Sequence, residues 1–234
     1  MKLKALETYF ATRLTSKLRN NISKDFRYKI LAETAKEDIN SLIVLGNGNI
    51  DDLAVPIVCH HLNGNKIVGI TKPDGKKRLN ALSELPTYIS RHKIDKIALI
   101  MDQEEDDLDE IFNQAEKKLM DQHIQFDVVN NNNRFKQYQC KHGSRTFDFI
   151  LIISGLNDFH TKTHKIEDHL VKGAFKLSRI SEDPQDSKET WNSVDTHTQG
   201  EILNGLVKSK SISSEVFPQH FNGLRLLEEQ FDSV

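Results

Sequence analysis

Two hydrophobic patterns alternate along the chain. Short runs of consecutive apolar residues predict buried strands, and longer segments with apolar residues three and four positions apart predict helices that bury one face. Strands are predicted at residues 41–46, 65–70, 96–102, 126–129 and 147–154. Helices are predicted at residues 1–20, 24–38, 50–62, 76–92, 108–122 and 166–175. This alternation predicts an α/β fold, with a mostly parallel, Rossmann-like sheet that is covered by helices on both faces.

Both ends of the chain depart from this alternation. The pattern predicts an N-terminal helical segment (1–40), an α/β domain (41–180) and a C-terminal helical segment (181–234) that packs on it. The last of these contains a polar linker followed by predicted helices at 193–209 and 218–231. Within the α/β domain, the polar and basic stretch 130–143 is typical of a hairpin or a loop.

Pro56 lies inside the predicted helix 50–62. Proline has no backbone N–H, and only the first turn of a helix can lack that donor without losing a hydrogen bond. We therefore expect this helix to begin close to Pro56.

Composition narrows the possible partners. The 234 residues carry a formal net charge of −2, so nucleic acid would have to be bound by a local basic patch or through a metal ion. No apolar run is long enough to span a bilayer, and the N-terminus lacks the continuous apolar stretch of a signal peptide. We therefore expect no membrane partner. The two cysteines, Cys59 and Cys140, are far apart in the sequence and form no pair of the kind that binds a metal, so we expect a cytoplasmic protein.

Three polar clusters follow predicted strands. They are residues 46–52 (GNGNIDD), 102–107 (DQEEDD) and 155–160 (GLNDFH), with residues 166–169 (IEDH) just beyond the third. Ligands of parallel α/β sheets collect at the carboxyl ends of the strands. We therefore expect the three clusters to converge at one edge of the sheet.

Asp102 is the most informative acid because it follows the strand residues IALIM directly. Glu104, two residues later, is close enough to share one cation with it, and oxygen ligands of this kind suit Mg²⁺. Asp106 competes with Glu104 for the role of second ligand. The positive end of the following helix dipole also explains why acids gather in this stretch. This explanation applies to Asp106, Asp107, Asp109 and Glu110.

Two further features allow more than one interpretation. Backbone N–H groups of residues 46–48 could cradle a phosphate at a helix start, although a tight turn explains the same glycines better. The stretch 130–143 carries basic and aromatic residues that could contact a nucleic-acid backbone and stack on bases, with a merely exposed hairpin as the favoured alternative. The basic residues are Arg134, Lys136, Lys141 and Arg145.

The strand-and-acid pattern resembles the TOPRIM domain of topoisomerases, primases and OLD-type nucleases. That family has a DxD motif after an apolar strand, and Asp102-Gln103-Glu104 matches it with Glu in place of the second Asp. Its other motif is a strand that ends in Glu-Gly, with an acid a few residues into the next helix. Residues 45–52 align with this motif, with Leu45 at the Glu position and Asp51 or Asp52 as the acid. Trp191 and the helix 217–231 loosely fit the helical C-terminus of stand-alone members.

The resemblance implies a Mg²⁺- or Mn²⁺-dependent phosphodiesterase or nuclease that acts on DNA or RNA. Asp102 and Glu104 would hold the metal and Asp51 or Asp52 would complete the site. Glu167 and Asp168 lie at the family's third acidic position. Because leucine cannot transfer a proton or bind a metal, Leu45 also supports an alternative. In that alternative the chain is a catalytically inactive TOPRIM-like module that binds nucleic acid or a partner protein such as an ATPase.

Overall fold

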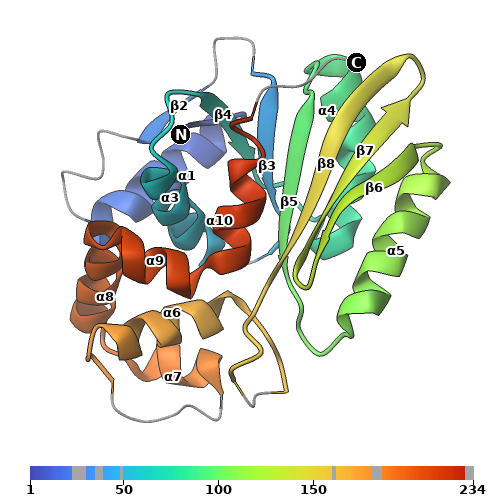
Figure 1. Ribbon diagram of the computed structural model, residues 1–234. Coiled ribbons are helices and arrows are strands. Elements are labelled where there is room, and N and C mark those ends of the chain that lie inside the picture. The colour runs from blue at the N-terminus through green and yellow to red at the C-terminus, as the bar shows by residue number, and fades with distance from the viewer. Residues whose placement is uncertain (23–29, 35–38, 48–49, 160–161, 181–185, 230–234) are drawn as a thin grey trace.

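A computed structural model describes residues 1–22, 30–34, 39–47, 50–159, 162–180 and 186–229 (Figure 1). In these residues eight strands form one sheet in the order β2-β1-β4-β3-β5-β8-β7-β6. The strands are β1 (Lys2–Ala5), β2 (Ile30–Thr34), β3 (Ser41–Leu45), β4 (Ile67–Thr71), β5 (Lys96–Asp102), β6 (Gln125–Asn132), β7 (Phe135–His142) and β8 (Arg145–Ser154). From β2 to β8 every neighbouring pair is parallel, and β7 is antiparallel to both of its neighbours. The predicted mostly parallel α/β sheet is confirmed.

Helices cover both faces of this sheet (Figure 1). They are α1 (Thr8–Asn21), α3 (Asp51–Leu62), the 3₁₀ helix η1 (Arg78–Glu84), α4 (Leu85–Arg91), α5 (Leu108–Asp121), α6 (Ile166–Lys176), α7 (Ser187–Ser193), α8 (Thr196–Lys208), α9 (Lys210–Val216) and α10 (Pro218–Arg225). The helices η1, α4 and α5 contribute to one apolar cluster, and α1, α3 and α6 to α10 contribute to the other. Successive residues of a strand belong to opposite clusters, as Leu99 and Ile100 do in β5.

The N-terminal segment differs from the prediction. Residues 2–5 form β1 and only then does α1 begin, and residues 30–34 form β2, where a helix was expected. Leu3 and Ala5 are buried, and β1 gains backbone hydrogen bonds from strands on both sides. Four residues carry little periodicity, so this tertiary pairing decides their conformation. The rest of the predicted helix 24–38 lies outside the described residues.

The expected start of the helix at Pro56 is wrong. Helix α3 begins at Asp51, directly after the β3 turn, and Pro56 lies inside it. The missing N–H of Pro56 costs one intrahelical bond. Burial of Val55 and Ile57 against the sheet offsets this cost.

The remaining differences from the prediction concern how the helices are divided. The predicted helix 76–92 is split into η1 and α4, and α9 was not predicted as a separate helix. The ambiguous stretch 130–143 is a hairpin between β6 and β7. Within the described part of the chain, each helix is too short or too polar to cross a bilayer.

Candidate functional site

The carboxyl ends of β3 and β5 mark the point where the chain's connections diverge. The chain leaves β3 through α3 on one face of the sheet and leaves β5 through α5 on the other. Ligands of doubly wound sheets bind in the crevice at such a point. Gly46 N–H donates to the Ile100 carbonyl at 2.8 Å, and Ile166 N–H donates to the Asp102 carboxylate at 2.9 Å. The predicted convergence of the three polar clusters is therefore confirmed.

Asp102 is the last residue of β5 and is buried, with 7% of its surface exposed. Its Oδ1 accepts the hydrogen bond from the Ile166 N–H at the start of α6. Burial, followed by the charge of Glu167, raises the pKa of Asp102 to about 7, and Glu104 raises it further. The strand and the helix start thus hold this carboxylate in one place, although the surroundings disfavour its charge.

Asp51, the first residue of α3, is 1% exposed. Neither of its carboxylate oxygens has a hydrogen-bond partner among the described residues. Burial and then the charge of Asp102 raise the pKa of Asp51 well above its usual value. Buried carboxylates are almost always paired or hydrogen-bonded, so a proton or a cation is needed to balance Asp51.

The adjacent acids Glu167 and Asp168 have different surroundings. The Glu167 charge raises the pKa values of both Asp51 and Asp102, and burial raises the pKa of Glu167 itself. Asp168 is fully buried; its Oδ2 accepts the Leu156 N–H at 3.1 Å and lies 3.2 Å from His164 Nδ1. Of the two sequence candidates, Glu167 joins Asp51 and Asp102, whereas Asp168 supports the loop after β8.

Asp52 has basic surroundings. It is fully buried, and its carboxylate lies 3.3 Å from Arg13, 3.6 Å from Lys17 and 3.6 Å from Lys72. Successive residues of a helix point about 100° apart, which separates Asp52 from its neighbour Asp51. Asp52 therefore anchors α1 and the end of β4 to α3.

Glu104 lies at the rim of the carboxylate group. Its backbone has a φ of 61° and pairs with His164 through two hydrogen bonds of 2.9 Å. Its side chain is 38% exposed and lies 3.0 Å from the Lys165 ammonium. Glu104 is therefore accessible as a second ligand beside Asp102, but its carboxylate already forms an ion pair with Lys165.

Asp106 and Asp107 serve the local structure. Asp106 pairs with Arg78 at 2.5 Å, and Arg78 also donates to the Gln103 carbonyl at 3.0 Å. Asp107 caps α5 by accepting the N–H groups of Asp109 and Glu110. The interpretation as helix-start charges is confirmed for Asp107, and Asp106 is turned toward an arginine.

Leu45 is the last residue of β3. It is 1% exposed and belongs to the apolar cluster beneath α3. Gly46 and Asn47 follow it in the turn, and Gly48 of the glycine pair lies outside the described residues.

The four basic residues of the hairpin region do not form one patch. Arg134 is 6% exposed and donates to Asn157 and to the Ser154 carbonyl, at the carboxyl edge of the sheet. Lys136 lies 4.6 Å from the centre of the Phe112 ring and 3.4 Å from Glu116. Arg145 pairs with Asp95 at 2.8 Å. Lys141 is exposed and is paired in the sheet with Thr146, near the opposite edge.

A buried polar network behind the site was not predicted. Gln219 of α10 donates to the Gly155 carbonyl at 2.9 Å and to the Ile153 carbonyl at 3.2 Å. His169 Nε2 accepts the Gly155 N–H at 3.0 Å, and its Nδ1 donates to the Val216 carbonyl at 2.6 Å. Burial lowers the pKa of His169 well below its usual value, so the ring is neutral. These bonds join residues far apart in sequence, and no local pattern predicts them.

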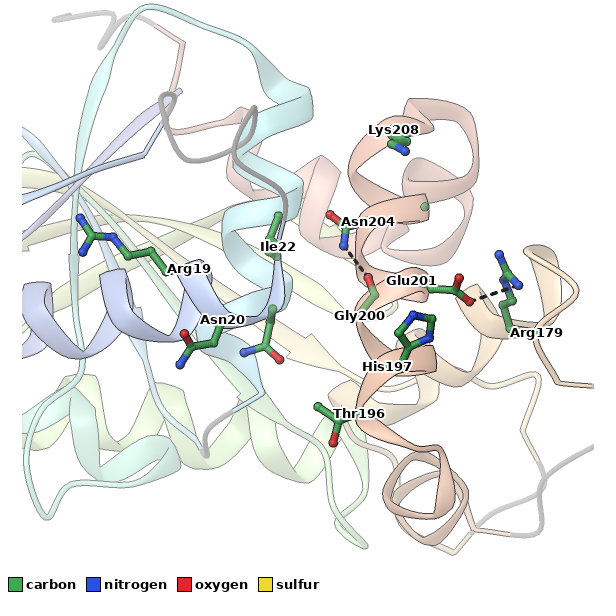
Figure 2. Close-up of a pocket in the computed structure, with 12 residues that line it drawn as sticks. Arg19, Asn20, Ile22, Arg179, Thr196, His197, Gly200, Glu201, Asn204 and Lys208 are labelled. Atoms are coloured by element: carbon green, nitrogen blue, oxygen red, sulfur yellow. Dashed lines mark hydrogen bonds and ion pairs between the residues drawn. The ribbon is translucent and has the colours of Figure 1, made fainter.

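A cavity of about 910 Å³ lies away from these acids, between the end of α1 and α8 (Figure 2). Its lining includes Arg19, Lys208 and the pair formed by Arg179 and Glu201 at 3.2 Å. None of the predicted acids lines this cavity.

Within the described ranges, no three His, Cys, Asp or Glu side chains already stand in the arrangement of a metal site. Asp51 and Asp102 nevertheless offer oxygen ligands of the type that Mg²⁺ prefers, and the Asp51 oxygens have no competing partner among the described residues. The donor set therefore fits a hard divalent cation that draws these carboxylates together. Comparison of the chain with protein-family models, curated proteins and solved structures found no match.

Proposed function

We propose that the chain binds Mg²⁺ or Mn²⁺ through Asp51, Asp102 and Glu167 and hydrolyses phosphodiester bonds of nucleic acid, as a divergent TOPRIM-type nuclease. The supporting observation is Asp51, a buried carboxylate with two unpartnered oxygens beside two further acids. Glu167 raises the pKa values of Asp51 and Asp102, and Asp102 raises that of Asp51, so a divalent cation that supplies the missing positive charge stabilises these acids. Glu104 lies at the exposed side of this group.

The roles of the side chains follow from their surroundings. Asp102 is held by the Ile166 N–H and is the fixed ligand, and Glu167 enters from α6. The bound cation would supply Lewis acidity toward the phosphoryl oxygens. Asp51 would be the third ligand, because neither of its oxygens has a competing partner among the described residues. The attacking water, whose pKa the cation lowers, passes its proton to solvent, and solvent returns a proton to the leaving ester oxygen. The new bond joins the water oxygen to phosphorus, and the ester oxygen leaves.

Leu45 favours a second candidate function. A buried leucine occupies the position where the family has its Glu, and leucine can neither transfer a proton nor bind a metal, so the chain would not catalyse hydrolysis. In this candidate the edge of the sheet serves as a binding module for nucleic acid or for a partner protein such as an ATPase.

One experiment separates the two functions. Mg²⁺ and Mn²⁺ are titrated calorimetrically into the wild type, Asp51→Asn, Asp102→Asn and the control Asp109→Asn, which removes an exposed acid of α5. The proposal expects binding that is lost in Asp51→Asn and Asp102→Asn and retained in the control.

Plasmid and single-strand cleavage is assayed on the same proteins. Cleavage that disappears with Asp51 and Asp102 identifies the nuclease. Metal binding without cleavage identifies the inactive module. Absence of both divalent-cation binding and cleavage in the wild type overturns the nuclease and leaves the inactive module.

A further inference from the structure

Helix α1 brings two cations to one buried carboxylate. The Arg13 guanidinium and the Lys17 ammonium lie one helical turn apart and both approach Asp52, at 3.3 Å and 3.6 Å. Asp52 carries a single negative charge, so one positive charge is in excess before Lys72, 3.6 Å from the same carboxylate, is considered. Neutralising a buried aspartate requires one cation, and this site has more than one.

Two hydrogen-bond donors of the α1 cations are not saturated. Lys17 Nζ is buried and has no hydrogen-bond partner among the described residues, and the same is true of Arg13 Nε. Burial lowers the pKa of Lys17, and the charges of Lys72 and Arg13 lower it further, whereas Asp52 opposes this shift. Among the described residues, Lys17 and Arg13 thus repel one another and each keeps one donor without an acceptor, which is typical of a site for an anion.

The cluster is partly exposed, although Lys17 Nζ and Arg13 Nε are themselves buried, and it adjoins the carboxylates. The side chains of Arg13, Lys17 and Lys72 are 33%, 22% and 17% exposed. Asp52 directly follows Asp51 in α3, and the Lys72 charge also lowers the pKa of Asp51. Positive and negative groups thus lie side by side at the carboxyl edge of the sheet.

We infer that Arg13, Lys17 and Lys72 form a phosphate-binding subsite beside the carboxylate group. Arginine offers its planar fork and lysine a point charge to the non-bridging oxygens of a phosphate. That this phosphate belongs to nucleic acid, next to the bond to be cut, rests on the proposed function. The inference gives the N-terminal segment, which precedes the TOPRIM-like part of the chain, a direct role in holding substrate.

The test uses inorganic phosphate and a short single-stranded DNA oligonucleotide as probes, both titrated calorimetrically at low salt in the presence of EDTA. The variants are Arg13→Gln and Lys17→Gln. The matched control is Arg179→Gln, which removes a cation from the one-to-one pair with Glu201 at the cavity of Figure 2. Either variant still leaves two cations at Asp52, so both are expected to fold, which circular dichroism checks.

The subsite is supported if each variant weakens phosphate binding at least tenfold and the control leaves it unchanged. Equal phosphate affinity in the wild type and the Lys17→Gln and Arg13→Gln variants overturns it, as does a wild type that binds no phosphate. A tenfold loss for phosphate with no loss for the oligonucleotide rejects the nucleic-acid assignment and leaves a site for free phosphate groups. Because EDTA removes divalent cations, phosphate binding here can succeed even where the metal titrations fail, so the two proposals are judged separately.

Discussion

Asp51 and Asp52 are consecutive buried residues whose carboxylates have opposite electrostatic surroundings. Asp51 faces the acids Asp102 and Glu167, whereas Asp52 lies within 3.6 Å of three cations. The first turn of α3 therefore divides the edge of the sheet into an acidic half and a basic half. The two aspartates should respond to the same substitution in opposite ways.

Asp51→Asn is expected to stabilise the metal-free protein at pH 7.5 by about 1–2 kcal/mol, because it removes a charge that burial and its neighbours disfavour. Asp52→Asn is expected to destabilise it by about 3 kcal/mol, because it leaves buried cations without their carboxylate. Urea unfolding in EDTA measures both free energies of unfolding. Changes of the same sign in the two variants would contradict the division of the edge.

Asp102 should make stability depend on pH. Its pKa rises from 3.8 to about 7 on folding, so the folded state binds this proton more tightly than the unfolded state does. The stability that the proton contributes is complete below the unfolded pKa and is lost as the pH rises through about 7. We expect Asp102→Asn and the wild type to be similar near pH 4, and the variant to be more stable at pH 8 by an amount on the order of 2–4 kcal/mol.

Unfolding of both proteins by urea at several pH values in EDTA tests this expectation. Added Mg²⁺ should remove part of the difference at pH 8, since only the wild type retains the carboxylate. A constant difference between the two proteins from pH 4 to pH 8 would show that Asp102 has an ordinary pKa.

Glu167 and Asp168 should separate metal binding from folding. Glu167→Gln is expected to weaken Mg²⁺ binding about tenfold or more with little loss of stability, because Glu167 adds charge to the acidic group. Asp168→Ala is expected to cost about 2 kcal/mol, because the buried Leu156 N–H loses its acceptor. Calorimetric Mg²⁺ titration and urea unfolding of the two variants measure these effects. If Asp168→Ala weakened Mg²⁺ binding and Glu167→Gln lowered the stability, the roles of the two residues would have to be exchanged.

Gly155 should not tolerate a side chain. Its φ is +119°, and an added Cβ would lie 2.5 Å from the Cβ of His164. Gly155→Ala is therefore expected to destabilise the protein by about 2–4 kcal/mol and to displace His164, whose backbone holds Glu104. Thermal unfolding measures the loss, and Gly143→Ala is a control because its φ of +60° is also positive but nothing lies within 4 Å of its added Cβ. Equal losses in both would show that the close approach to His164 is unimportant.

The sequence predicts the centre of the fold well because β3, β5 and β8 are buried on both faces along most of their length and therefore contain runs of consecutive apolar residues. It also places Asp102 correctly at the end of a strand, because the change from apolar residues to acids shows where the buried strand ends. β1 and β2 were missed because they are short and their conformation depends on distant partners.

The orientation of adjacent acids could not be predicted from their spacing. Asp51 and Asp52 both lie in the first turn of α3, and only the positions of Arg13, Lys17 and Lys72 show which of them is neutralised. Glu167 and Asp168 present the same problem in α6. Their separation depends on the loop after β8, whose hydrogen bonds to Gln219 and His169 cross long stretches of sequence.

The bond between Gln219 and the Gly155 carbonyl spans 64 residues. At 5–20 residues per second, a ribosome needs roughly 3–13 seconds to add that much chain. During this interval the eight described strands of the sheet have been synthesised, but the turn at Gly155 lacks its hydrogen bond from α10. The Gly155 carbonyl therefore gains this hydrogen bond only after α10 has been synthesised.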